Sequence, residues 1–178
     1  MQGAFLNAVI YQPPCIYGVQ LLPFSCWHGL VLEEMKSSYI VGGVRDINEA
    51  ISVLWVCSHK YEDGLNIAAK VKELKKLGKR IKPSEYQEVV LQIDEYIRKS
   101  ISTPEVWRGE KENKRLKAPI WWHLVYFGIK FLGLSEIEAW NYSFLKLFNF
   151  MMCECEYNGS IDLVAEDEME FILSHSVN

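Results

Sequence analysis

The segment "DINEAISVLWVCSHKY", residues 46–61, holds the clearest local signal for a helix in this chain. Asp46 is a residue type that caps helix N-termini, and Glu49 follows at the spacing of a capping box. Apolar residues then recur every three or four positions from Ile47 to Leu54, which is the period of an α-helix. The segment therefore predicts a helix with one face in the core.

The same segment ends in a Cys-x-His pair, Cys57 and His59, and an earlier pair, Cys26 and His28, has the same spacing. Four such side chains are candidate zinc ligands. In a helix, however, positions i and i+2 lie about 200° apart around the axis, so the two side chains of a pair diverge. We therefore expect buried thiols on two core helices and no metal site. A site that takes one ligand from each segment is the alternative.

Further helices are indicated by start and stop signals along the rest of the chain. Expected helices cover about residues 25–38, 63–77, 119–133 and 135–159, and another starts at Pro83 with an apolar stripe that runs to Ile97. Alternation typical of a strand is unconvincing, apart from a possible short piece within residues 5–22. The predicted fold class is mainly α, a single-domain bundle of about five to seven helices.

Three regions are expected along the chain. Residues 1–24 contain Pro13, Pro14 and Pro23 and are predicted to form an extended N-terminal arm. Residues 25–159 form the helical domain. Residues 160–178 are an acidic tail with a possible short helix around 165–173.

Composition narrows the class of protein. The chain has 178 residues, of which 49% are hydrophobic, and this argues against disorder. Its five cysteines are an odd number without a disulfide-framework spacing, and no signal-peptide pattern opens the chain. The most apolar run, residues 118–134, is interrupted by His123 and Lys130 and is shorter than a spanning helix needs. We expect a cytosolic protein with free thiols and no membrane contact.

Motifs of catalysis are missing from the sequence. It has no phosphate loop, no G-x-G-x-x-G and no G-x-S-x-G. A nucleophilic pair could be drawn from Cys26 or Cys57 with His123, but nothing in the sequence brings these residues together. We expect no enzyme activity, no cofactor and no catalytic residue. A small Cys/His-dependent enzyme or metal-binding regulator is the less favoured reading.

Charge is distributed unevenly along the chain. Fourteen of the nineteen Lys and Arg residues lie between Lys70 and Lys117, whereas seven acidic residues follow residue 150. A solvated helix face is the simplest interpretation, and attraction between the acidic and basic parts of two copies is the second. A nucleic-acid binder that uses the Lys70–Lys82 face is the third and least favoured interpretation, because the lysines are not interleaved with aromatic residues.

Aromatic residues gather in "PIWWHLVYFGIKF", residues 119–131, and in the helix expected after Ser135. Their apolar stripes are broader than a single contact between two helices would cover. Tryptophan, tyrosine and methionine are typical of partner surfaces, although a core position is the other interpretation. The candidate partner-binding residues are Trp121, Trp122, Tyr126, Trp140, Phe144, Phe148 and Met151.

The order of these features resembles a known family. "VGGVRDINEAISVLWVCS" opens one helix, a charged middle follows, and "GLSEIEAWNYSFLKLFNFMMCECEYNG" is a short capped helix that leads into a longer one. Over residues 41–60 and 128–159 the chain is similar to the tail assembly chaperones of bacteriophages and prophages. The resemblance implies a non-enzymatic assembly protein of the host cytoplasm that binds the elongated tape measure protein and self-associates. A structural component of the virion is the related alternative, with the N-terminal arm reaching a neighbouring subunit.

Overall fold

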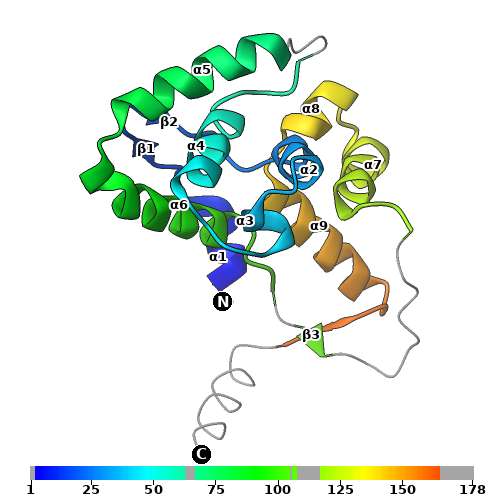
Figure 1. Ribbon diagram of the computed structural model, residues 1–178. Coiled ribbons are helices and arrows are strands. Elements are labelled where there is room, and N and C mark those ends of the chain that lie inside the picture. Colours follow the sequence, from blue (N-terminus) through cyan, green and yellow to red (C-terminus); the bar gives the residue numbers. More distant parts are fainter. Residues whose placement is uncertain (1–2, 63–66, 105, 108–116, 165–178) are drawn as a thin grey trace, which may run out of the picture.

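The computed structural model describes residues 3–62, 67–104, 106–107 and 117–164, and these residues form a mainly helical protein (Figure 1). The predicted fold class is therefore confirmed. Nine α-helices lie in the described residues, more than the expected five to seven. The higher number comes from short helices of eight residues or fewer. These are α1 (Gly3–Ile10), α3 (Ser38–Val41) and α8 (Glu136–Asn141).

The longer helices and the strands complete the order of elements. The helices are α2 (Cys26–Glu34), α4 (Ile47–Val56), α5 (Ile67–Arg80), α6 (Tyr86–Ser100), α7 (Ile120–Leu132) and α9 (Phe144–Tyr157), with a 3-10 turn at Pro83–Glu85. Two antiparallel strand pairs accompany them: β1 (Cys15–Ile16) with β2 (Val19–Gln20), and β3 (Val106–Trp107) with β4 (Asp162–Leu163).

The N-terminal arm is only partly extended. Residues from Gly3 to Ile10 form α1, which packs against α9 and α6, so the prediction of an extended conformation is wrong there. The prolines of the first 24 residues all lie after Ile10. Residues 3–10 contain no helix breaker other than Gly3, which is the first residue of α1. From Tyr11 onward the chain is extended or turns through the β1–β2 hairpin.

Two expected helix boundaries also differ from the structure. The helix expected over residues 25–38 ends at Glu34, because Lys36 takes a left-handed conformation with φ of 54°, and α3 starts again after Ser37. The helix expected to stop at Gly78 continues to Arg80. Gly78 lies on the inner side of α5 against Ile51, where it serves packing. The helix considered at residues 165–173 lies outside the described residues.

Helix α4 occupies the centre of the molecule (Figure 1). It packs against α5, α6 and α2, and α2 in turn packs against α7 and α8. The predicted cap at Asp46 forms, since its carboxylate accepts hydrogen bonds from the backbone N–H groups of Asn48 and Glu49. The Glu49 side chain does not complete the capping box by bonding to the Asp46 backbone N–H. It accepts from the Ser37 hydroxyl at 2.8 Å and so ties α3 to α4.

The segment before α2 joins the two halves of the chain. The Phe144 N–H donates to the Phe24 carbonyl at 2.8 Å, next to a bridge between Ser25 and Ser143. The Leu22 carbonyl accepts from the Tyr96 hydroxyl at 2.8 Å. Residues 21–25 thus connect α6 with the start of α9. Within the described part of the chain, no helix combines the length and the apolar character that crossing a bilayer requires.

Candidate partner-binding surface

Helix α7 has apolar side chains on both of its faces. One face lies in the core, where Trp121, Leu124 and Val125 are buried. On the other face Trp122, Tyr126 and Ile129 are 50%, 57% and 41% exposed. These three residues are spaced by four and three positions, so they form one row along the helix. We call them the outer α7 row.

The inner face of α7 is held in place by an aromatic cluster. The Trp121 ring lies 5.2 Å from the ring of Phe144 and 6.2 Å from that of Phe24, measured between centroids. Its indole N–H donates to the Glu33 carboxylate of α2. A methyl group on Gly29 would overlap the Trp121 ring, so α2 and α7 approach closely only because this residue has no side chain.

The outer α7 row contacts α8 through Trp122. Trp122 packs edge-on against the buried Trp140, with ring centroids 4.9 Å apart and planes at 86°. The Lys130 ammonium lies 5.4 Å from the centre of the Tyr126 ring, in cation–π geometry. Both aromatic side chains are therefore oriented by a neighbour while half of their surface stays open to solvent.

The seven predicted partner-binding residues divide between the surface and the core. Trp122 and Tyr126 are exposed, and Phe148 and Met151 are half-buried against the core. Trp121, Trp140 and Phe144 are only 6%, 3% and 5% exposed. These three side chains are enclosed by the protein's own core and do not reach a partner. The prediction that they belong to a partner surface is therefore corrected. Ile129 was missed, although its spacing from Trp122 places it in the row.

A second exposed apolar surface lies between α1 and α9. A groove with a volume of about 510 Å³ is lined there by Phe5, Val9, Tyr142 and Phe150, among others. Val9 and Phe150 are both exposed. This groove runs beside the contact between α1 and the outer side of α9 and shares no residue with the outer α7 row.

The Cys-x-His pairs serve the fold. Cys26 and Cys57 are fully buried, and burial raises the pKa of both thiols to about 12. His28 is buried as well, because α2 is covered on nearly all sides at its first turn. Its Nδ1 accepts from the Ser25 N–H and its Nε2–H donates to the His59 carbonyl at 2.8 Å.

His59 follows the end of α4 and lies beside Ser58 and Glu73. Its Nδ1–H donates to the Trp55 carbonyl at 2.7 Å, and the Ser58 hydroxyl donates to the same carbonyl at 2.8 Å. The Glu73 carboxylate accepts from the Trp55 indole at 2.7 Å. The Ser58 hydroxyl also lies 3.1 Å from His59 Nδ1, and His59 Nε2 lies 3.5 Å from the Glu73 carboxylate. In the bonding described here, the hydroxyl and the imidazole both donate to the Trp55 carbonyl and so cap the end of α4. No group of three or more potential metal ligands occurs among the described residues.

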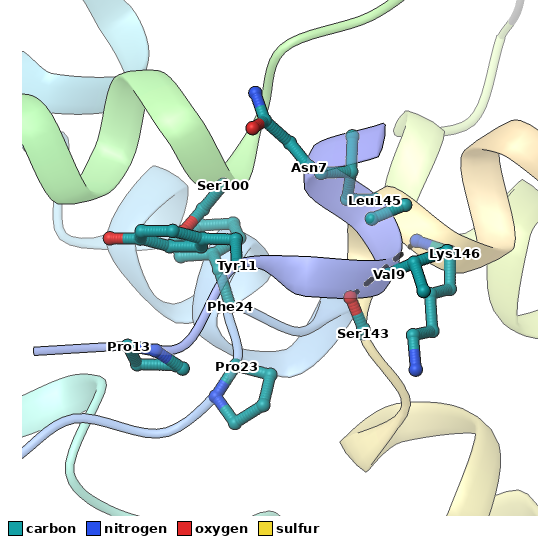
Figure 2. Close-up of a pocket in the computed structure, with 11 residues that line it drawn as sticks. Asn7, Val9, Tyr11, Pro13, Pro23, Phe24, Ser100, Ser143, Leu145 and Lys146 are labelled. Atoms are coloured by element: carbon teal, nitrogen blue, oxygen red, sulfur yellow. Dashed lines mark hydrogen bonds between the residues drawn. The ribbon is translucent and has the colours of Figure 1, made fainter. Parts of the chain in front are cut away.

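A small cavity lies where the end of α1 meets the start of α9, with Tyr11, Phe24 and Ser143 around it (Figure 2). Its volume is about 90 Å³. Ligand pockets usually measure about 300–1,000 Å³, so this cavity is too small for a cofactor.

Comparisons with known proteins return no match: no family model, no curated protein and no solved structure matches this chain.

Proposed function

We propose that this chain is a non-enzymatic assembly protein of the phage tail chaperone type, which binds an elongated helical partner, the tape measure protein, in the host cytoplasm. The proposal rests on one observation. The outer α7 row exposes Trp122, Tyr126 and Ile129 on a helix whose other face is core. Exposed apolar rows of this kind mark surfaces that bind another protein.

The row suits a helical partner in spacing and in rigidity. Positions i, i+4 and i+7 are the anchors by which one helix packs along another. Trp122 and Tyr126 have two side-chain torsions each and are already oriented by Trp140 and Lys130, so little conformational entropy is lost on binding. Interfaces draw most of their affinity from a few aromatic residues of this type.

The test is capture of the partner by tagged protein from cells that carry the native gene neighbourhood, with identification by mass spectrometry. We expect a long helical tape-measure-like protein to be captured by wild type. The W122A/Y126A variant is expected to lose about 2–4 kcal/mol of binding free energy, roughly a 30- to 1,000-fold weaker complex. Both side chains are half-exposed, so the variant should keep the wild-type circular dichroism spectrum and a cooperative unfolding transition, with a lower melting temperature because the contact of Trp122 with Trp140 is lost.

Matched variants separate this surface from the others. Leu91 is an exposed apolar residue on α6, and L91A should bind as wild type does. Loss of capture in V9A/F150A with retention in W122A/Y126A would assign the partner to the groove between α1 and α9 and contradict the proposal. Capture of tail-shell or capsid proteins, with this chain present in purified particles, would instead favour a virion component.

A further inference from the structure

Helix α5 presents a dense row of cations to solvent. Lys72, Lys75, Lys76, Lys79 and Arg80 are all exposed, and at 100° per residue they occupy one side of the helix. We call these five residues the basic α5 face. Leu74 and Leu77 lie on the opposite side and pack against the core.

The cations of the basic α5 face have no ion-pair partner among the residues that the structure describes. The nearest acidic residue in sequence, Glu73, is already bonded to the Trp55 indole and lies 3.5 Å from His59. Within the described part of the chain, these five side chains thus combine exposure to solvent with positive charge, which suits an anionic partner.

The chain carries the complementary charge at the other end of the molecule. Glu154 and Glu156 on the last turns of α9 and Asp162 on β4 are exposed, and the sequence continues with acidic residues over 166–170. Figure 1 shows α5 and the β3 strand, to which β4 pairs, at opposite ends of the fold. No basic residue follows Lys146 to offset this acidic end.

We propose that the basic α5 face binds the acidic C-terminal segment, residues 166–170, of a second copy of this chain. The length of the chain after Val164 favours a second copy over the same copy as the source of this segment. Residue 170 is only six residues after Val164, so a fully extended chain carries it at most about 20 Å from Val164. A compact chain of this length has a radius of gyration of about 16 Å, so it is roughly 40 Å across.

A second copy fits the charge pattern better than a nucleic acid does. The whole chain has a net charge of -4, which repels a polyanion at long range. Single-stranded binding surfaces interleave basic residues with stacking aromatics, and residues 72–80 contain no aromatic residue. The acidic segment, in contrast, is supplied at equal concentration by every copy.

The contact is head-to-tail, because the two complementary surfaces lie at different ends of one molecule. Such a contact leaves a free face at each end of a pair and therefore repeats, giving rings or open chains. Its strength comes from exposed charges, so it weakens as salt shortens the screening length from about 10 Å at 0.1 M to about 3 Å at 1 M. Self-association is thus predicted to depend on both protein concentration and salt.

Charge reversal on each side tests the proposal by analytical ultracentrifugation of the full chain at 50 mM salt. We expect wild type to form oligomers that dissociate towards 1 M salt. K72E/K76E/K79E alone and E166K/D167K/E168K alone should each raise the dissociation constant on the order of tenfold or more. An equimolar mixture of the two variants should associate again, since each then meets its opposite charge. A control with the same change in net charge, K36E/K117E/K146E, should keep wild-type assembly.

The remaining outcomes overturn the proposal. Monomeric wild type at 50 mM salt, or a mixture of the two variants that stays monomeric, excludes the intermolecular contact. If wild type instead retards a labelled 20-nucleotide DNA or RNA at that salt and K72E/K76E/K79E does not, with no self-association, the face binds nucleic acid. The proposal is independent of the outer α7 row, so W122A/Y126A should assemble as wild type does.

Discussion

His28 is a buried histidine whose two ring nitrogens are both occupied. Nδ1 accepts from the Ser25 N–H at 3.0 Å, and Nε2–H donates to the His59 carbonyl. Removal from water lowers the pKa of His28 to about 4, although the carbonyl partner acts in the opposite direction. The neutral ring thereby fixes the start of α2 against the end of α4, and this arrangement requires the side chain to remain unprotonated.

The lowered pKa of His28 makes stability depend on pH in a defined direction. Between pH 6.5 and 4 the unfolded chain binds a proton at this residue and the folded chain does not, so stability falls as pH falls through this window. Above pH 6.5 the contribution is constant. The loss approaches about 3 kcal/mol near pH 4, from a shift of about 2.5 pKa units. Urea denaturation at pH 7.5, 6.0 and 5.0 measures it, and an unchanged pH slope in H28Q would contradict this assignment.

The packing of α2 on α7 depends on a single missing side chain. Gly29 faces the Trp121 ring, and a β-carbon there would occupy the space of the ring atoms. G29A should therefore destabilise the protein by about 1–3 kcal/mol, despite the better helix propensity of alanine. The matched control is G78A on α5, whose added carbon would lie 3.5 Å from Ile51, an ordinary contact. Thermal unfolding compares the two. A G29A variant as stable as G78A would show that α2 and α7 separate without cost.

The elements that the sequence predicted well are those whose signals are local. Asp46 caps α4, and Ser135 forms a capping box with Glu138, because both bonds involve residues within three positions. The role of Gly78 was not predictable in this way. A glycine late in a helix pattern indicates a stop, whereas α5 continues to Arg80 and Gly78 lies beside Ile51, a residue 27 positions away.

The candidate surface also depends on contacts between residues far apart in the sequence, which a local sequence pattern does not reveal. Trp121 and Trp122 are adjacent and equally apolar, so no property of the sequence states which one faces the core. The choice is made by Gly29 and Glu33 of α2, which accommodate the Trp121 ring and accept its N–H. A sequence pattern could name the aromatic cluster but could not divide it into core and surface.

The whole molecule encloses two of its five thiols in one core. Cys26 and Cys57 have no exposed surface, whereas Cys15 and Cys153 are exposed. At pH 8, iodoacetamide should modify Cys15 and Cys153 on the order of 10³-fold faster than the buried pair, which reacts only when the core opens. Peptide mass spectrometry follows each site, and in 8 M urea all five should react. Equal native rates at Cys26 and Cys15 would mean that the helices near α2 do not form a cooperative unit.

The bond between Phe24 and Phe144 has a consequence for the order in which the protein is made. Phe24 leaves the ribosome early, but the residue that donates to its carbonyl is translated 120 positions later. At about 5–20 residues per second, that interval lasts roughly 6–24 s. During this time the Phe24 ring lacks its partners Trp121 and Phe144, so the nascent chain exposes an unfinished aromatic cluster until α9 emerges. Translation must therefore proceed through the start of α9 before the centre of this protein can close.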